Sequence, residues 1–309
     1  MSKKFLKNRF NILLAAVISG SLLLSGLAGC GGSGTEAEET NDQDSTENDT
    51  DGPVNIQFDN TTFSLPSPYQ MAYLVKSLNL DYNKDFVNPT KNASKYTNNF
   101  KKALNLGVYG ADLGYLNIYE QTPDAINYFS VIKKLSEDLD LLAAFNAETI
   151  NRIESNMGNK DSLMYILSNT YRTADAYLKD NERKDIGVLI LAGGWIESTF
   201  ILTQIALNNK SQQEVINRIG EQKNPLENLI KILSPFYNES NEYTELTEKL
   251  IDLAYEFDGI DINYTYEAPI IDKEKKLTII NSKSEVVMSD EQLQTINKKI
   301  GAIRNLITE

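Results

Sequence analysis

Apolar residues from residue 53 onward recur mostly every three or four positions, the spacing of amphipathic helices. Pro123 suits the first turn of a helix, and Ser289 with Gln292 forms a capping-box pattern at the start of another. Residues 211–236 form either one helix or two helices broken near Asn224-Pro225. The pattern predicts helices over these ranges: 68–78, 94–121, 124–139, 147–157, 161–179, 184–208, 211–236, 243–257 and 289–307.

The periodicity changes near the C-terminal end. Ile262, Tyr264 and Tyr266 alternate with polar residues, which predicts a strand. The ranges 277–280 and 285–288 predict a hairpin that turns at residues 281–284. The chain shows no fixed repeat length, so a regular solenoid is not expected. We therefore predict a mainly α fold, a multi-helix bundle with a small β-hairpin or sheet appendage near the C-terminus.

The N-terminus has the layout of a secretory signal, with four basic residues in positions 3–9 and an apolar run over 12–24. The run ends in Leu27-Ala28-Gly29-Cys30, which resembles the lipobox of bacterial lipoproteins. That resemblance implies that the chain is cut before Cys30, that its thiol is acylated, and that the lipid anchors the protein to a membrane. The alternative is an ordinary cleaved signal, which would leave a lone exported thiol.

Gly31, rather than Asp, follows Cys30. In Gram-negative lipoproteins this arrangement resembles cargo sent on to the outer membrane, and whether the protein faces the periplasm or the cell surface stays open. Residues 36–51 hold eight acids and no base, a composition that cannot bury a core. The expected organisation is a signal peptide over 1–29, an acidic disordered tether over 30–53 and a helical domain over 54–309, with a possible boundary near 259–269.

Charge and missing residue types exclude several functions. The formal net charge is −13, and removal of the four bases in residues 1–29 takes it to −17, so no nucleic-acid partner is expected. The chain has no histidine and one cysteine, which rules out Ser-His-Asp and Cys-His nucleophiles and histidine-bearing metal sites. No calcium-loop motif appears in the helical part, and we expect no metal and no cofactor.

Two apolar helices each carry one acid. Asp112 is the only charge between Lys102 and Glu120, and Glu197 is the only charge between Asp185 and Lys210. Glycines precede both acids, and we expect them to let these two helices pack closely. The first interpretation is an internal ion-paired or hydrogen-bonded network with Arg172 and tyrosines as donors. The alternative is a pair of catalytic carboxylates, as in glycoside hydrolysis.

Aromatic residues give weaker candidates. Tyr115, Tyr119 and Trp195, with Arg172, could contact a ligand, although tyrosines more often lie between the core and the rim of a bundle. The run 186–207 is long enough to span a membrane, but Glu197 in its middle favours the central helix of a water-soluble bundle.

The segments 65–70, 92–115 and 181–198 resemble helical bacterial lipoproteins of unassigned function. That resemblance implies an α-helical envelope lipoprotein and no particular activity. The function expected from the sequence is a non-enzymatic binding or scaffold module of the cell envelope, with an envelope protein or a glycan as partner. The alternatives are a carboxylate-dependent glycan hydrolase and a small-molecule binder that uses the space between the glycine-rich helices. The oligomeric state stays open.

Overall fold

The computed structural model describes residues 54–58, 61–65, 80–141, 147–159, 162–163, 165–166, 183–208, 213–272 and 277–309. The chain divides into two units, residues 1–47 and 48–309, and all described residues belong to the second. The predicted lipid site Cys30, the tether over 30–53, the helix over 68–78 and most of the helix over 161–179, with Arg172, lie outside the described residues.

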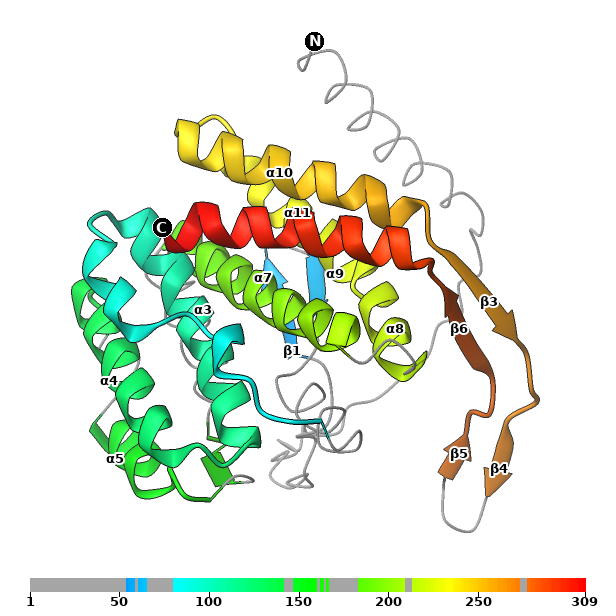
Figure 1. Ribbon diagram of the computed structural model, residues 1–309, viewed down its shortest axis with the longest axis horizontal. Coiled ribbons are helices and arrows are strands. Elements are labelled where there is room, and N and C mark those ends of the chain that lie inside the picture. The colour runs from blue at the N-terminus through cyan, green and yellow to red at the C-terminus, as the bar shows by residue number, and fades with distance from the viewer. Residues whose placement is uncertain are drawn as a thin grey trace, which may run out of the picture. The chain divides into compact units, whose positions relative to one another are not determined.

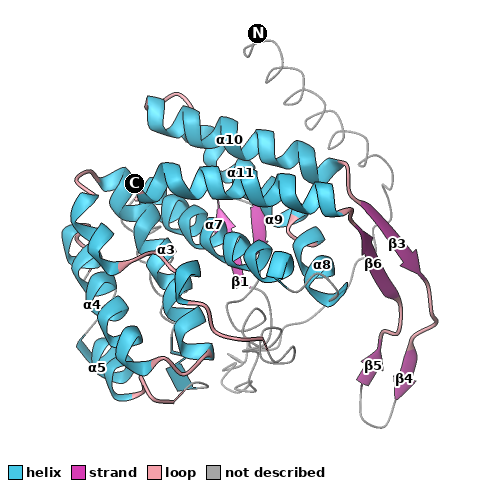
Figure 2. Cartoon of the chain, viewed as in Figure 1, coloured by secondary structure: helices cyan, strands magenta, loops and turns pink. Residues whose placement is uncertain are grey.

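The described part is mainly α-helical, as predicted, and carries a small antiparallel appendage near the C-terminus (Figures 1 and 2). Short 3-10 helices lie before and between the α-helices: η1 (Lys84–Phe86), η2 (Thr90–Lys95) and η3 (Ser234–Phe236). The α-helices are α3 (Asn99–Ile118), α4 (Thr122–Asp138), α5 (Ala147–Ser155), α7 (Lys184–Asn208), α8 (Gln213–Gly220), α9 (Lys223–Leu233), α10 (Asn241–Asp258) and α11 (Asp290–Thr308).

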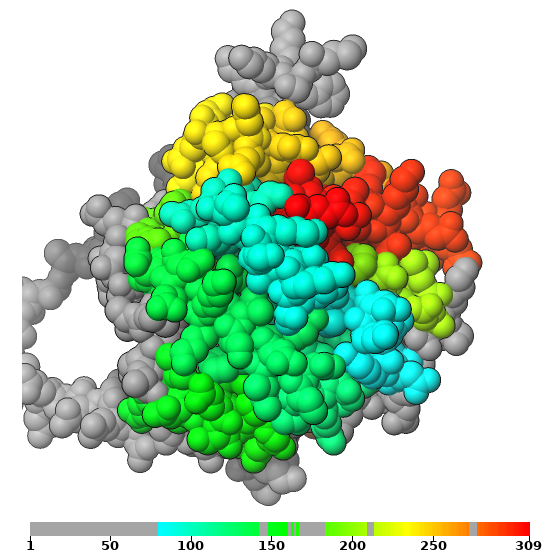
Figure 3. Space-filling view, turned by 60° about the vertical axis from the view of Figure 1, so that its left-hand side comes forward, coloured from blue at the N-terminus to red at the C-terminus, as the bar shows by residue number. Residues whose placement is uncertain are grey.

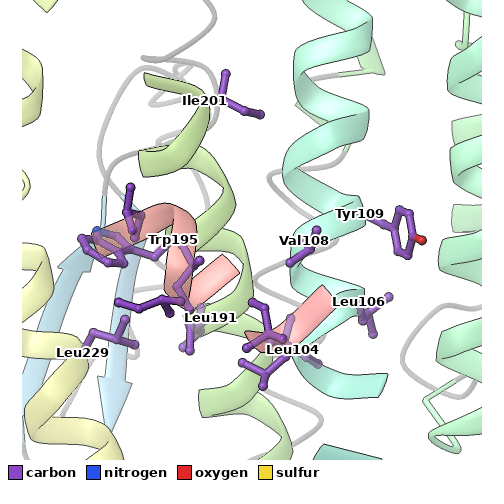
Figure 4. Close-up of a cluster of buried hydrophobic side chains, with 14 of the residues drawn as sticks. Leu104, Leu106, Val108, Tyr109, Leu191, Trp195, Ile201 and Leu229 are labelled. Atoms are coloured by element: carbon purple, nitrogen blue, oxygen red, sulfur yellow. The ribbon is translucent and has the colours of Figure 1, made fainter. Parts of the chain in front are cut away.

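Helix α7 is the centre of the fold. It is apolar on all sides, as expected of a helix covered by others, and it packs against α3 on one side and α11 on another. Leu104 and Val108 of α3 point toward α7 (Figure 4), whereas Tyr109 points away and meets Tyr128 of α4 edge to face. Helix α3 therefore lies between α7 and α4.

Glycines set the distance between α3 and α7. A Cβ atom added to Gly107 would lie 2.0 Å from the carbonyl oxygen of Ile190, and one added to Gly193 would lie 1.8 Å from that of Leu104. Both distances are far below any real contact, so the two backbones touch at these points. The close packing that the sequence predicted for these helices is confirmed, and it leaves no interhelical space for a ligand at this crossing.

Two predicted helices differ most from the structure. Residues 94–95, predicted as the start of a helix, belong instead to the 3-10 helix η2, because Asn98 caps α3 by accepting a hydrogen bond from the N–H of Lys101. In the range 211–236 the break lies at residues 221–222, ahead of Asn224-Pro225. Pro225 fits within the first turn of α9, where its missing N–H costs nothing.

The strands near the C-terminus pair differently from the prediction. Strand β3 (Asp261–Thr265) pairs with β6 (Lys283–Val287), and β4 (Ile270–Asp272) pairs with β5 (Leu277–Ile279). The predicted hairpin around 281–284 is therefore wrong. The Ser282 hydroxyl there bonds both the N–H and the carbonyl of Glu267 on the other side, so this bend belongs to one long ribbon.

A further hairpin, β1 (Val54–Phe58) with β2 (Thr61–Leu65), was not predicted. Val54, Ile56 and Phe58 alternate with polar residues, so the signal for the first strand was present in the sequence. Strand β2 lies beside α9.

The capping box at the start of α11 is confirmed, because the Ser289 and Gln292 side chains each bond the backbone of the other residue. The Gln292 side chain also donates to the carbonyl oxygen of Gly259 at the end of α10. Lys299 bridges α11 to Asp252 and Glu256 of α10. Helix α11 is thus fixed along α10, and its C-terminal end contacts the segment that precedes α3 (Figure 3).

Candidate functional site

The two lone acids meet in the interior. Asp112 comes from α3 and Glu197 from α7, and both side chains are 0% exposed. They are close enough for the protonated Asp112 carboxyl to form a hydrogen bond with Glu197. The contact follows from the glycine crossing, since both helices carry small residues close to their acid.

The cation that balances this pair is Arg304, on α11. Its Nε and Nη2 each donate to one carboxylate oxygen of Glu197 at 2.7 Å, so the pair is bidentate. Nη2 also reaches the carbonyl oxygen of Phe86 at 3.3 Å, and the guanidinium lies 4.4 Å from the ring centroid of Phe200. The Arg304 side chain is only 12% exposed and that of Glu197 0%, so the ion pair is largely shielded from solvent.

Asp112 lies in a setting that disfavours its charged form. Burial, followed by the neighbouring Glu197 carboxylate, raises the pKa of Asp112 well above its ordinary value of 3.8, against the opposing effects of Arg304 and the Asn88 N–H. Oδ2 accepts from that N–H at 3.1 Å, whereas Oδ1 has no hydrogen-bond partner while the group is ionised. A proton on Oδ1, donated to Glu197, satisfies both carboxyl groups.

Arg304 keeps its charge in this interior. Burial alone would lower the pKa of the guanidinium, but the Glu197 carboxylate outweighs burial and the net pKa is raised. The two carboxyls, which share one proton, and the guanidinium therefore carry no net charge together. This neutrality lowers the free-energy cost of removing the three groups from water.

The polar contacts continue to the end of the chain. Asn105 lies two turns before Asp112 on α3, and its Nδ2 donates to the carbonyl oxygen of Ile307 at 2.7 Å. Tyr96 donates to the carbonyl oxygen of Thr308 at 3.2 Å and accepts from Asn88 Nδ2 at 2.9 Å. Carbonyls in the last turn of a helix have no partner within the helix, so these side chains complete α11.

The aromatic candidates are core residues. The Tyr115 hydroxyl accepts from the N–H of Asn83 at 3.1 Å, and its ring packs against the rings of Tyr82 and Tyr119. Trp195 is buried and donates from Nε1 to Gln222 at 3.2 Å. Tyr119 is half-buried in the Tyr82–Tyr115 cluster.

The buried phenols are poor acids. Burial, followed by the charge of Asp124, raises the pKa of Tyr82 to about 12. Burial also raises the pKa values of Tyr109, Tyr119 and Tyr128, which keeps these phenols neutral at any physiological pH. None of them is arranged as an activated nucleophile.

The geometry limits the chemistry that Asp112 and Glu197 can perform. A glycosidase needs its two carboxyls on either side of a bound sugar, with one free to donate a proton and the other to attack or activate water. Here Arg304 occupies both oxygens of Glu197, and neither acid has any exposed area. Within the described residues, no group of three or more His, Cys, Asp or Glu side chains could hold a metal ion.

Helix α7 is long and apolar enough to cross a membrane by length and composition. Most of its apolar stretch is buried inside the fold, as in the core helix of a water-soluble protein.

We expect Asp112→Asn to leave stability nearly unchanged at about pH 4, within about 1 kcal/mol, and to become more stable than the unsubstituted chain as pH rises. An Asn side chain can accept from the Asn88 N–H through Oδ1 and donate to Glu197 through Nδ2, as the protonated acid does. Chemical denaturation of the two proteins measures the difference.

The same pair of proteins gives a pH test. Because the folded-state pKa of Asp112 is raised, the native state binds more protons than the unfolded state at pH values above 3.8, so stability falls as pH rises toward the folded pKa. The fall has a limiting slope of about 1.4 kcal/mol per pH unit, and Asp112→Asn should lack this contribution. Identical pH profiles for the two proteins would show that Asp112 titrates normally.

Sequence reasoning identified Asp112 and Glu197 but not Arg304, Asn105 or Asn88. Arg304 lies on the apolar side of the last helix, between Ile300 and Ile307. A charged residue in that position was the feature of the sequence that could have identified it as the buried partner. Comparisons with protein-family models, with curated proteins and with solved structures find no match for this chain.

Proposed function

We propose that this chain is a lipid-anchored protein of the bacterial cell envelope whose helical domain is a non-enzymatic binding or scaffold module. The anchor rests on Leu27-Ala28-Gly29-Cys30 after a basic and apolar start. The non-enzymatic role is supported by one observation, the burial of both candidate catalytic acids in the Asp112–Glu197–Arg304 network. Asp112 and Glu197, the two lone acids of the apolar helices, form with Arg304 a network that connects α3, α7 and α11.

The structure argues against the two alternative functions. A glycan hydrolase built on Asp112 and Glu197 would need access for a sugar, and both side chains are fully buried. A small-molecule site between the glycine-rich helices would need space there, and the backbones touch at Gly107 and Gly193. Partner binding is therefore proposed for the outer surface of the domain.

Cys30→Ser should abolish acylation of the chain. A Ser hydroxyl cannot take the thioether lipid, and Cys30 is the only cysteine. The measurement is incorporation of a palmitate analogue into the full-length chain. Cys30→Ser should lose the label, whereas Ser25→Ala should keep it.

Retention of the label by Cys30→Ser would overturn the proposed anchor. The non-enzymatic part has its own test, because purified protein should hydrolyse no envelope glycan. Hydrolysis that Asp112→Asn abolishes, without a lower unfolding midpoint, would establish the enzyme instead.

A further inference from the structure

The ribbon of residues 261–287, here named the β-arm, extends from the ends of α10 and α11 away from the helices (Figures 1 and 2). Large apolar side chains of the β-arm are between 44% and 77% exposed. An exposed apolar surface of this extent marks an interaction site. These residues are Ile262, Tyr264, Tyr266, Ile270, Ile271, Leu277, Ile279, Ile280 and Val287.

Contacts with α8 fix the β-arm at its base. Val286 donates its N–H to Asn217 and accepts from the Gln213 side chain, both at 2.8 Å, and its side chain packs on Gly220. Farther out, the described residues form a two-stranded ribbon, which in isolation is marginally stable in water. A surface that adds strands would stabilise it.

Strand β3 has an open edge. The N–H and C=O groups of Val286 bond to side chains of α8, so they point away from β3. Ile262 lies opposite Val286 in the register, so its own N–H and C=O groups point away from β6. Tyr264, two residues on, has the same orientation. Neither backbone has a hydrogen-bond partner among the described residues, so both can pair with another strand.

We propose that the β-arm is a dimerisation surface, on which β3 pairs antiparallel with β3 of a second copy about a two-fold axis at Asn263. This register places Ile262 opposite Tyr264 of the second copy, and the outward backbone groups of both residues bond across the axis. The product is a four-stranded sheet, β6–β3–β3–β6, with two Ile–Tyr cross-strand pairs.

Charge selects this register over its neighbour. A two-fold axis at Tyr264 would place Asp261 opposite Glu267 of the second copy, which is unfavourable for like charges. The axis at Asn263 places Asp261 opposite Thr265 instead. Residues 261–287 hold five acids and four lysines, so two β-arms can approach although each whole chain is strongly acidic.

A second copy would cover apolar side chains of β3. Ile262, Tyr264 and Tyr266 are 50–70% exposed, and pairing of the two strands would cover part of these side chains in both copies. Insertion into a bilayer fits less well, because the sequence between Ile271 and Leu277, Asp272-Lys273-Glu274-Lys275-Lys276, is charged throughout.

Disulfide trapping tests the register in the full-length protein. Asn263→Cys on the two-fold axis would have a Cα–Cα distance of about 4.5 Å to its copy, within disulfide range. Thr265→Cys would be four residues out of register with its copy and too far away. Mild oxidation should therefore cross-link Asn263→Cys into a dimer and leave Thr265→Cys monomeric on a non-reducing gel. The unsubstituted chain controls for cross-linking through Cys30.

The mass of the detergent-solubilised protein, corrected for bound detergent, should be twice that of one chain. Ile262→Glu with Tyr264→Glu should weaken dimerisation about 100-fold or more, with an unchanged circular dichroism spectrum because both positions are exposed. A monomeric mass at micromolar concentration, or equal cross-linking of Asn263→Cys and Thr265→Cys, would overturn the proposal. So would a Cys30→Ser chain that stays with membranes until Ile262→Glu and Tyr264→Glu release it, since lipid would then be the occupant.

Discussion

Glu197→Gln is expected to lower the free energy of unfolding by about 3–5 kcal/mol, because it removes the carboxylate that is ion-paired with Arg304 and leaves only the more distant Asp112 carboxyl to balance the guanidinium charge. Gln has almost the same shape as Glu, so the loss reports charge rather than packing. For a domain of this size, a loss of this magnitude lowers the melting temperature on the order of 10 °C. Urea denaturation followed by circular dichroism measures both the midpoint and the slope.

The matched control is Glu221→Gln. Glu221 also pairs with an arginine, Arg218, at 2.6 Å, but this pair lies on the surface. Exposed pairs contribute about 0–1 kcal/mol, so Glu221→Gln should be close to neutral. Equal effects of the two substitutions would mean that water reaches Glu197 and that the network is not sealed.

Gly107→Ala and Gly193→Ala should each cost about 3 kcal/mol or more. The added methyl group would meet backbone carbonyls of the facing helix at 1.8–2.0 Å, and a backbone cannot rotate away as a side chain can. Helices α3 and α7 would have to separate, which also pulls Asp112 from Glu197. The gain of about 1 kcal/mol in helix propensity offsets only part of this loss.

Gly301→Ala provides the comparison in a third helix. A Cβ there would lie 3.7 Å from Phe200, an ordinary contact, so the propensity gain should appear as a small stabilisation. Thermal denaturation of the three variants separates the two effects. If all three behave alike, the close approach of α3 and α7 does not determine stability.

Much of the helical framework was predictable because it depends on local periodicity. The bounds of α7 match the predicted 184–208, since its ends follow from where apolar residues begin and stop. The start of α3 was misjudged because Asn98, a favourable cap, lies within an apparently continuous pattern. Local sequence rules therefore predicted which segments are helical better than they predicted where each helix starts.

The site was only half predictable. Isolation of Asp112 and Glu197 in apolar helices indicated burial, and burial required a partner. The partner of Glu197 is Arg304, which lies 107 positions away in the chain. No local rule predicts a contact over that distance in the sequence. Arg172 was named because it was available. Arg304, on the apolar side of the last helix, carried the better signal.

The β-arm shows the same limit in strands. Alternation identified residues 262–266 and 277–280 as extended, but alternation does not specify which strands pair. Ser282, interpreted as part of a turn, instead joins the two sides of the ribbon.

A double-mutant cycle on Glu197 and Arg304 tests most directly whether the buried acids form a structural network. The singles Glu197→Met and Arg304→Met each remove one partner of the buried ion pair, and each should lose about 3–5 kcal/mol. The double variant removes both charges and should lose no more than either single, a coupling of about 3 kcal/mol or more. Losses that simply add, with no coupling, would contradict the account.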